Sequence, residues 1–177
     1  MGTVPTSASV ITLSPVELVL RVAAATLGAG ESPPNTNRGP FVAECLKTTG
    51  LPEGHPWCAA YTTRVGLAAL GAAWPVLKSA SVQQQADWAQ RRGCRLVATK
   101  TPALPGDLFC LYYPTLKRFA HIGFVVSVKP DGRTIESIEG NTSGNGSREG
   151  WVVASKTRVL TARDRLIRWA NVVNLNP

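Results

Sequence analysis

Two side chains in this sequence have the chemistry of an acyl-transfer site: the thiol of Cys58 and the imidazole of His121. A thiolate attacks a carbonyl carbon readily, and a histidine beside it can protonate the leaving amine. Cys58 follows a loop over residues 51–56 and opens an Ala-rich segment that the pattern predicts to be a helix reaching about Leu70. At a helix N-terminus the dipole and the free amides favour a thiolate and can stabilise an oxyanion.

The segment around His121 has the alternation of a β-strand over residues 120–128. Its apolar side chains fall on one face, which is therefore predicted to face the core. These side chains are Ile122, Phe124, Val126 and Val128. His121 falls on the other face beside Gly123, where the absence of a side chain leaves room for a second group to approach.

The partners of His121 follow from the next strand, which starts after the turn Pro130-Asp131-Gly132. A type I turn with a Gly bulge pairs Lys129 with Arg133, so paired residue numbers sum to 262. On this register His121 faces Asn141 and Gly123 faces Glu139, and all four positions share one face of the sheet. A histidine flanked by a carboxylate or an amide is oriented for catalysis, and the sequence leaves open which of the two dominates.

The remaining cysteines are predicted to be buried core residues with reduced thiols, because they lie among apolar neighbours. They are Cys45, Cys94 and Cys110. The sequence has no C-x-x-C pair and no histidine at ligand spacing from a cysteine, so a structural zinc site is not expected.

His55 is the alternative base, because the chain has two histidines. It lies between Gly54 and Pro56, in a loop three residues before Cys58. No strand partner is predicted to orient it there, so we favour His121 as the base.

The elements that must position these residues change type half way along the chain, which predicts an α+β fold with N-terminal helices packed on an antiparallel sheet of about six strands. Helices are expected over 15–28, 41–49, 57–70 and 82–92. Strands are expected over 94–99, 107–113, 120–128, 134–140, 151–159 and 166–173. No linker divides the sequence, so we expect one domain over residues 1–177 with a core of about 14–173.

Four segments, in this order, resemble the CHAP family of cysteine- and histidine-dependent amidohydrolases and peptidases, which is related to the NlpC/P60 peptidases. They are PWCAAY at 56–61, PGDL at 105–108, AHIGFV at 120–125 and IEGN at 138–141. The segments at 37–40 and 50–52 also look like those of phage-associated members. The resemblance implies a papain-like α+β domain that cleaves amide bonds in peptidoglycan.

Carried over to this sequence, the resemblance implies that Cys58 is the nucleophile and His121 the general base and acid. Glu139 and Asn141 match the acidic and amide positions that orient the imidazole. Some members bind calcium in an Asp-rich loop near the nucleophile, but residues 51–57 here offer only Glu53 and His55. Calcium needs several oxygen ligands, so we expect no metal and no cofactor.

The net charge of +8 favours an anionic partner. Residues 1–60 hold three basic and four acidic side chains, so the positive excess lies in the later two thirds. We expect contact with anionic envelope polymers, which charge reversal of Arg163, Arg165 and Arg168 should weaken. Basic residues are not interleaved with aromatic ones, so we expect no nucleic acid partner, and we expect a monomer.

The function predicted from the sequence is a peptidoglycan amidase or endopeptidase, from a phage lysis enzyme or from a bacterial effector exported by a contractile secretion system. A basic binding module with an inert cysteine is the alternative of another class. Residues 1–13 carry no Lys or Arg, so we expect no signal peptide, synthesis in the host cytoplasm and release to the wall through a membrane pore. The loop Gly140–Gly150 and the loop before Cys58 are predicted to form walls of the cleft. Trp57 and Trp151 are candidate contacts with the substrate, and the alternative is that both are packing residues.

Overall fold

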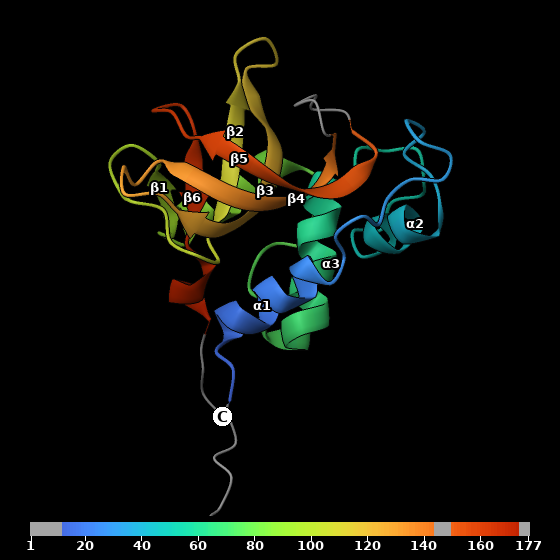
Figure 1. Ribbon diagram of the computed structural model, residues 1–177, viewed down its shortest axis with the longest axis horizontal. Helices are drawn as coiled ribbons and strands as arrows, with labels where there is room; N and C mark the ends of the chain where they lie inside the picture. The colour runs from blue at the N-terminus through green and yellow to red at the C-terminus, as the bar shows by residue number, and fades with distance from the viewer. Residues whose placement is uncertain (1–11, 144–149, 174–177) are drawn as a thin grey trace, which may run out of the picture.

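Helices fill the first half of the chain and strands the second half (Figure 1). The computed structural model describes residues 12–143 and 150–173. The helices in these ranges are α1 (Pro15–Ala24), α2 (Pro40–Lys47), α3 (Cys58–Leu70) and α4 (Val82–Arg91), with a short 3₁₀ helix, η1, at Gly71–Ala73. In the part of the chain that is described, no helix is both long and apolar enough to cross a membrane.

Helix α1 begins where the sequence predicts it, because Ser14 and Glu17 form a reciprocal capping box. The Ser14 hydroxyl accepts from the Glu17 N–H at 3.2 Å, and the Glu17 carboxylate accepts from the Ser14 N–H at 2.7 Å. The predicted end at Gly28 is wrong. The helix stops at Ala24, and the next residues form tighter turns in which the Thr26 N–H bonds to the Ala23 carbonyl.

Within the described residues, six strands form one antiparallel sheet in the order β1-β6-β2-β3-β4-β5, which confirms the α+β prediction. The strands are β1 (Arg95–Val97), β2 (Leu108–Tyr113), β3 (Arg118–Val128), β4 (Thr134–Thr142), β5 (Val152–Val159) and β6 (Arg165–Ile167). The predicted strand 166–173 is wrong in its second half, which is the 3₁₀ helix η2 (Trp169–Val172). There the buried Trp169 turns inward and donates its Nε1–H to the Gly106 carbonyl at 2.6 Å.

The register between β3 and β4 agrees with the prediction near the site for a reason the sequence did not reveal. Phe124 pairs with Ile138 and Val125 with Ser137, as the sum of 262 requires. Toward the turn the pairing is shifted by one residue, because Lys129 is bonded to Thr134 rather than Arg133. A bulge between Val125 and Ser127 compensates for this shift, so the predicted alignment is recovered at Val125 and Phe124, where the pairing of the two strands ends. The predicted pairs of His121 with Asn141 and of Gly123 with Glu139 stay predictions.

The sheet is covered by helices on one face, where α3 contacts both β3 and β4 (Figure 1). The core between helices and sheet is rich in aromatic rings, including Trp57, Tyr61, Trp74, Phe124 and Trp169. A second core lies among side chains of the other face, and includes Phe109, Val125, Ile135, Leu160 and Leu166. His121 and Gly123 alternate with the helix-facing residues of β3, so they belong to the second face, as predicted.

Candidate active site

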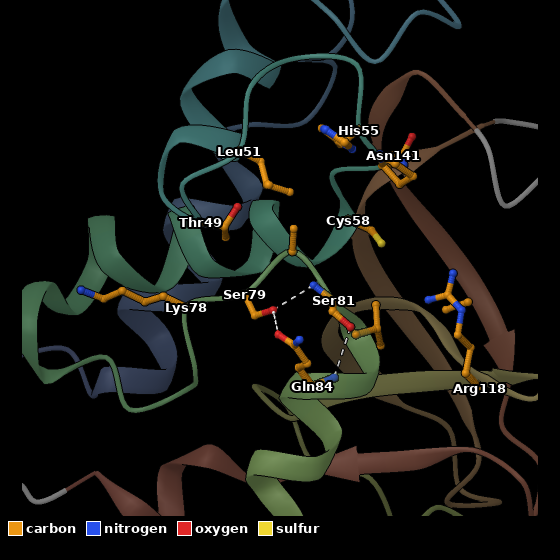
Figure 2. A pocket seen from close by; sticks show the side chains of 14 residues that line it. Thr49, Leu51, His55, Cys58, Lys78, Ser79, Ser81, Gln84, Arg118 and Asn141 are labelled. Carbon is orange, nitrogen blue, oxygen red and sulfur yellow. Dashed lines mark hydrogen bonds between the residues drawn. The ribbon is translucent and has the colours of Figure 1, made fainter.

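Cys58 is the first residue of α3 and lines a cleft of about 510 Å³, although only 4% of the residue is exposed (Figure 2). We call this the Cys58 cleft. Its walls are formed by Thr49, Leu51, His55, Pro56, Cys58, Lys78, Ser79, Ala80, Ser81, Val82, Gln84, Arg118, Ala120 and Asn141. The first amides of a helix have no partner within that helix, so the sulfur lies beside N–H groups that can bind a negative oxygen.

His121, in β3, is the second residue of the candidate site. It is 1% exposed, and its Nε2 lies 2.7 Å from Oε2 of Glu139. The other ring nitrogen, Nδ1, is buried and makes no hydrogen bond within the described residues. Cys58 is near enough to raise the pKa of the imidazole, and Nδ1 is the ring nitrogen that Glu139 leaves unbonded.

The pKa of His121 is set by competing effects. Burial lowers the pKa, but hydrogen bonds and charge interactions with Cys58 and Glu139 outweigh burial and raise it to about 9. The imidazole is therefore held in its protonated form at neutral pH, in which it can donate to a leaving group.

Glu139 is fully buried, and its carboxylate is hydrogen-bonded to Arg158, Ser137 and His121. Arg158 donates from Nε to Oε1 at 2.8 Å and from Nη2 to Oε2 at 2.6 Å, while the Ser137 hydroxyl donates to Oε1 at 2.7 Å. Burial acts to raise the pKa of Glu139, but the bonds from Arg158 and His121 lower it to about 2. The carboxylate therefore stays ionised beside the imidazole.

Gly123 provides the space that the carboxylate occupies. A Cβ at this position would lie 2.8 Å from Cγ of Glu139 and 2.9 Å from Cε1 of Phe109. These separations are shorter than side chains tolerate, so any larger residue at 123 would displace Glu139.

Asn141 occupies a different place from Glu139, although the sequence offered both as partners of His121. It has a left-handed backbone, with φ of 55°, and lines the Cys58 cleft. In the amide orientation that satisfies its neighbours, its oxygen accepts from the Trp57 N–H at 3.2 Å and its nitrogen donates to the Gly150 carbonyl at 2.5 Å. Asn141 thus ties β4 to the start of α3, and Glu139 holds the imidazole.

The predicted contact between Trp57 and substrate is wrong. The indole is 0% exposed, packs edge-on against Tyr61 at 6.3 Å and donates its Nε1–H to Glu31 at 3.0 Å. A buried ring has no surface to offer a ligand, so Trp57 fixes the start of α3 by packing.

Three other predicted positions have different outcomes. Trp151 is 41% exposed but is not among the residues that line the Cys58 cleft, so its contact with substrate stays a prediction. The predicted wall 140–150 includes residues 144–149, which lie outside the described residues. His55 is exposed on the cleft wall near Asn141 and makes no bond to His121 or Glu139 that would place it in their network (Figure 2).

The other three cysteines are buried, as predicted. Burial raises the pKa of the Cys45 thiol to about 12, and it also raises the pKa of Cys94 and of Cys110. These thiols are held in their neutral form, and none of them lines the Cys58 cleft. Among the four cysteines, Cys58 alone has both a cleft and an imidazole within reach.

Arg158 was not predicted as a site residue from the sequence. Its only signal is position: Ala154, Lys156 and Arg158 alternate on β5, on the face that pairs with Ser137 and Glu139 of β4. A long basic side chain on that face can reach the carboxylate diagonally, but the order of the strands must be known first.

Glu53, in the loop before Cys58, has a structural partner. The Glu53 carboxylate accepts a hydrogen bond from the Gly39 N–H at 2.5 Å. Within residues 12–143 and 150–173, no three His, Cys, Asp or Glu side chains are grouped in a way that could hold a metal ion.

This arrangement has the parts of an acyl-transfer site: a thiol in a cleft, a protonated imidazole and a buried carboxylate behind it. Comparison with known proteins agrees with this chemistry, because the family model for the CHAP domain matches residues 50–141, from the loop before Cys58 to Asn141. No curated protein and no solved structure matches the chain. CHAP domains are hydrolases of the amidase and peptidase classes that act on peptidoglycan. Since the match spans more than half of the sequence, the chain belongs to the CHAP domain family.

Proposed function

We propose that the protein hydrolyses an amide bond of peptidoglycan through a thioester on Cys58. The Cys58 thiolate attacks the carbonyl carbon, and the C–N bond breaks as protonated His121 gives its proton to the leaving amine. Neutral His121 then takes a proton from water, and the resulting hydroxide attacks the thioester. The S–C bond breaks, which releases the carboxylic acid and regenerates the thiolate.

The observation that carries this proposal is the position of His121 between two partners. Its Nε2 is bonded to Glu139, its Nδ1 is buried with no hydrogen-bond partner among the described residues, and Cys58 lies near enough to raise its pKa. A buried nitrogen without a partner is costly in a purely structural histidine. In a catalytic histidine it is the atom that exchanges the proton with the thiol and the substrate.

The start of α3 supports the second requirement of the reaction, which is stabilisation of the oxyanion. The tetrahedral intermediate puts a negative charge on the former carbonyl oxygen, and this oxygen must lie near donors. The first backbone amides of α3 supply such donors next to the sulfur, and the helix dipole adds to their field.

The test is mass spectrometry of purified peptidoglycan digested by the wild-type protein and by Cys58→Ala. The wild type should release fragments with new amino and carboxyl ends, whose masses identify the bond as muramoyl-alanine, stem-peptide or crossbridge. Cys58→Ala should release none, while Cys45→Ala, which removes a buried thiol, should retain the fragment pattern. Equal digestion by Cys58→Ala would contradict the thioester mechanism, and no digestion by the wild type would favour a binding module.

We further propose that the enzyme serves in phage lysis and reaches the wall through a separate membrane pore. The support is the resemblance of residues 37–40 to phage-associated members of the family. A secretion-system effector of the same chemistry is the alternative. The gene neighbourhood tests the choice, because a pore-forming holin gene supports phage lysis and an immunity gene supports the effector.

A further inference from the structure

We propose that Arg118 forms a subsite in the Cys58 cleft for a free carboxylate of the substrate. The proposal rests on the proposed function and adds to it the charge of the substrate that the cleft selects. Its prediction is that peptides with a free carboxylate near the cleaved amide are preferred over the same peptides with that carboxylate amidated.

Among the described residues, the charged side chains that line the Cys58 cleft are all positive. They are Lys78 and Arg118, and no Asp or Glu is found in this part of the lining. The acidic group of the site, Glu139, is buried behind His121 and neutralised by Arg158, so it contributes little negative field to the cleft. An anionic group entering the cleft therefore meets attraction without a competing carboxylate.

Arg118 differs from the other arginines of the sheet because its side chain is uncommitted. Arg158 binds Glu139, and Arg168 binds Asp107. Arg165 donates to backbone carbonyls of residues 162–164. No hydrogen bond or ion pair of the Arg118 side chain occurs within the part of the chain that the structure describes.

The position of Arg118 directs it to the reacting sulfur. It is the first residue of β3, three residues before His121, and it shares the cleft wall with Ala120. Figure 2 shows its guanidinium pointing from β3 toward Cys58 and Asn141, whereas Lys78 extends away from Cys58 at the opposite end of the cleft. Arg118 is thus the cation placed to contact a group next to the cleaved bond.

The other polar groups near α4 are less suited to binding an anion because they are satisfied by one another. The Ser79 hydroxyl donates to Gln84 at 2.7 Å and accepts from the Ser81 N–H at 3.0 Å (Figure 2). The Ser81 hydroxyl in turn accepts from the Gln84 N–H as the cap of α4. These bonds shape one wall of the cleft and leave the two cations, Arg118 and the more distant Lys78, as its charged donors.

A guanidinium binds a carboxylate through two parallel N–H donors, and this geometry does not suit a neutral amide equally well. Peptidoglycan stem peptides offer this distinction directly, because the α-carboxyl of their γ-linked glutamate is free in some walls and amidated in others. A carboxylate subsite would make the enzyme sensitive to that single modification.

The experiment compares two soluble muropeptides that differ only in this group, a free α-carboxyl or its amide on the glutamyl residue. Hydrolysis is measured for the wild type, Arg118→Gln, Arg118→Lys and Lys78→Gln. The wild type should prefer the free acid in kcat/KM, and Arg118→Gln should reduce this preference by about tenfold or more, mainly through KM. Arg118→Lys should keep part of the preference, and Lys78→Gln should change it less than Arg118→Gln.

Arg133→Gln is the matched control, since Arg133 lies beyond the other end of β3 in the exposed turn before β4 and its loss also removes one positive charge. It should leave the ratio between the two muropeptides unchanged. Binding of both muropeptides to Cys58→Ala, with and without Arg118→Gln, is measured by calorimetry and does not depend on turnover. Tighter binding of the free acid that is lost in the Arg118 variant supports the subsite. Equal binding of acid and amide, or an unchanged ratio in Arg118→Gln, overturns it, whereas absence of hydrolysis by the wild type alone would contradict the proposed function.

Discussion

Arg158 binds both carboxylate oxygens of Glu139, at 2.8 and 2.6 Å, while one of those oxygens also bonds to Nε2 of His121 at 2.7 Å. The arginine comes from β5, the glutamate from β4 and the histidine from β3, so hydrogen bonds link side chains of three neighbouring strands. His121 is the member of this network nearest to Cys58. The orientation of the imidazole therefore depends on a residue that never touches the cleft.

Replacing Arg158 with Met should destabilise the protein, because Glu139 would remain buried without its main partner. Breaking a buried ion pair by removing one member costs about 3–5 kcal/mol. Urea unfolding at pH 7 measures this loss. The double variant Arg158→Met with Glu139→Gln, which also removes the carboxylate, should recover part of the lost stability. A loss in the double variant equal to the sum of the losses in the two single variants would contradict the coupling.

The pH dependence of hydrolysis should follow the imidazole of His121. Its pKa of about 9 means that the acid that protonates the leaving amine is present below pH 9 and is lost above it. We therefore expect kcat/KM to fall as the pH rises through about 9. Protonated His121 should also stabilise the folded state. This contribution to the free energy of unfolding should be complete below about pH 6.5 and lost as the pH rises through about 9.

Glu139→Gln provides the control for that assignment. It removes a hydrogen bond and a negative charge that both raise the pKa of His121, so the basic limb of the kcat/KM profile should move to lower pH. An NMR titration of the ring resonances of His121 measures the same shift directly. An unmoved limb would mean that another group controls the alkaline loss.

Gly123→Ala should impair catalysis more than its effect on stability explains. The added methyl would lie 2.8 Å from Cγ of Glu139 and displace the carboxylate from His121. Overpacking of this kind costs about 1–3 kcal/mol. Gly66→Ala is the comparison, because Gly66 lies in α3 and its Cβ would meet the Trp74 ring rather than Glu139. Folded Gly66→Ala should retain kcat, whereas folded Gly123→Ala should lose it, and equal kcat in both would contradict the role of Gly123.

The sequence allowed prediction of features that depend on local chemistry. The capping box of Ser14 and Glu17 starts α1. Alternation in residues 120–128 places the side chains of His121 and Phe124 on opposite faces of β3. The secondary structure of residues 166–173 was harder to predict, because the apolar residues around Trp169 suit a strand as well as the 3₁₀ helix η2 that they form. Tertiary packing against Gly106 decides between the two, and no local signal reports that contact.

The parts of the candidate site that depend on a single hairpin were predictable from the sequence, and those that depend on the order of the strands were not. The contact between His121 and Glu139 follows from one hairpin, although an extra turn residue and the bulge before Ser127 had to cancel. Arg158 was missed because its contact needs the order of β4 and β5. Trp57 was misassigned because proximity to Cys58 in sequence says nothing about the face on which an indole packs.

The basic side chains near the C-terminus should separate into structural and surface groups. Arg168 makes a bidentate pair with the buried Asp107, at 2.8 and 3.1 Å, so Arg168→Glu should destabilise the fold by about 3–5 kcal/mol. Arg163 is exposed, and Arg163→Glu should leave the melting temperature nearly unchanged while weakening sedimentation with purified walls at low salt. The structure therefore separates Arg168 from Arg163, although the sequence predicted that both, with Arg165, contribute to wall binding.

Salt supplies the control for the wall-binding prediction. At about 1 M ionic strength the screening length falls to about 3 Å, and the difference between wild type and Arg163→Glu should disappear. Unchanged sedimentation of Arg163→Glu at low salt would show that this charge does not contribute to wall binding.

The central claim, that the Cys58 thiolate is the nucleophile, is tested most directly by stoichiometric alkylation of the native protein with iodoacetamide. Peptide mapping by mass spectrometry follows the labelling of each cysteine, and hydrolysis of peptidoglycan is measured on the same samples. We predict that Cys58 is labelled first and that activity falls in proportion to its labelling, with Cys45, Cys94 and Cys110 protected by burial. Full labelling of Cys58 with hydrolysis retained would contradict the account.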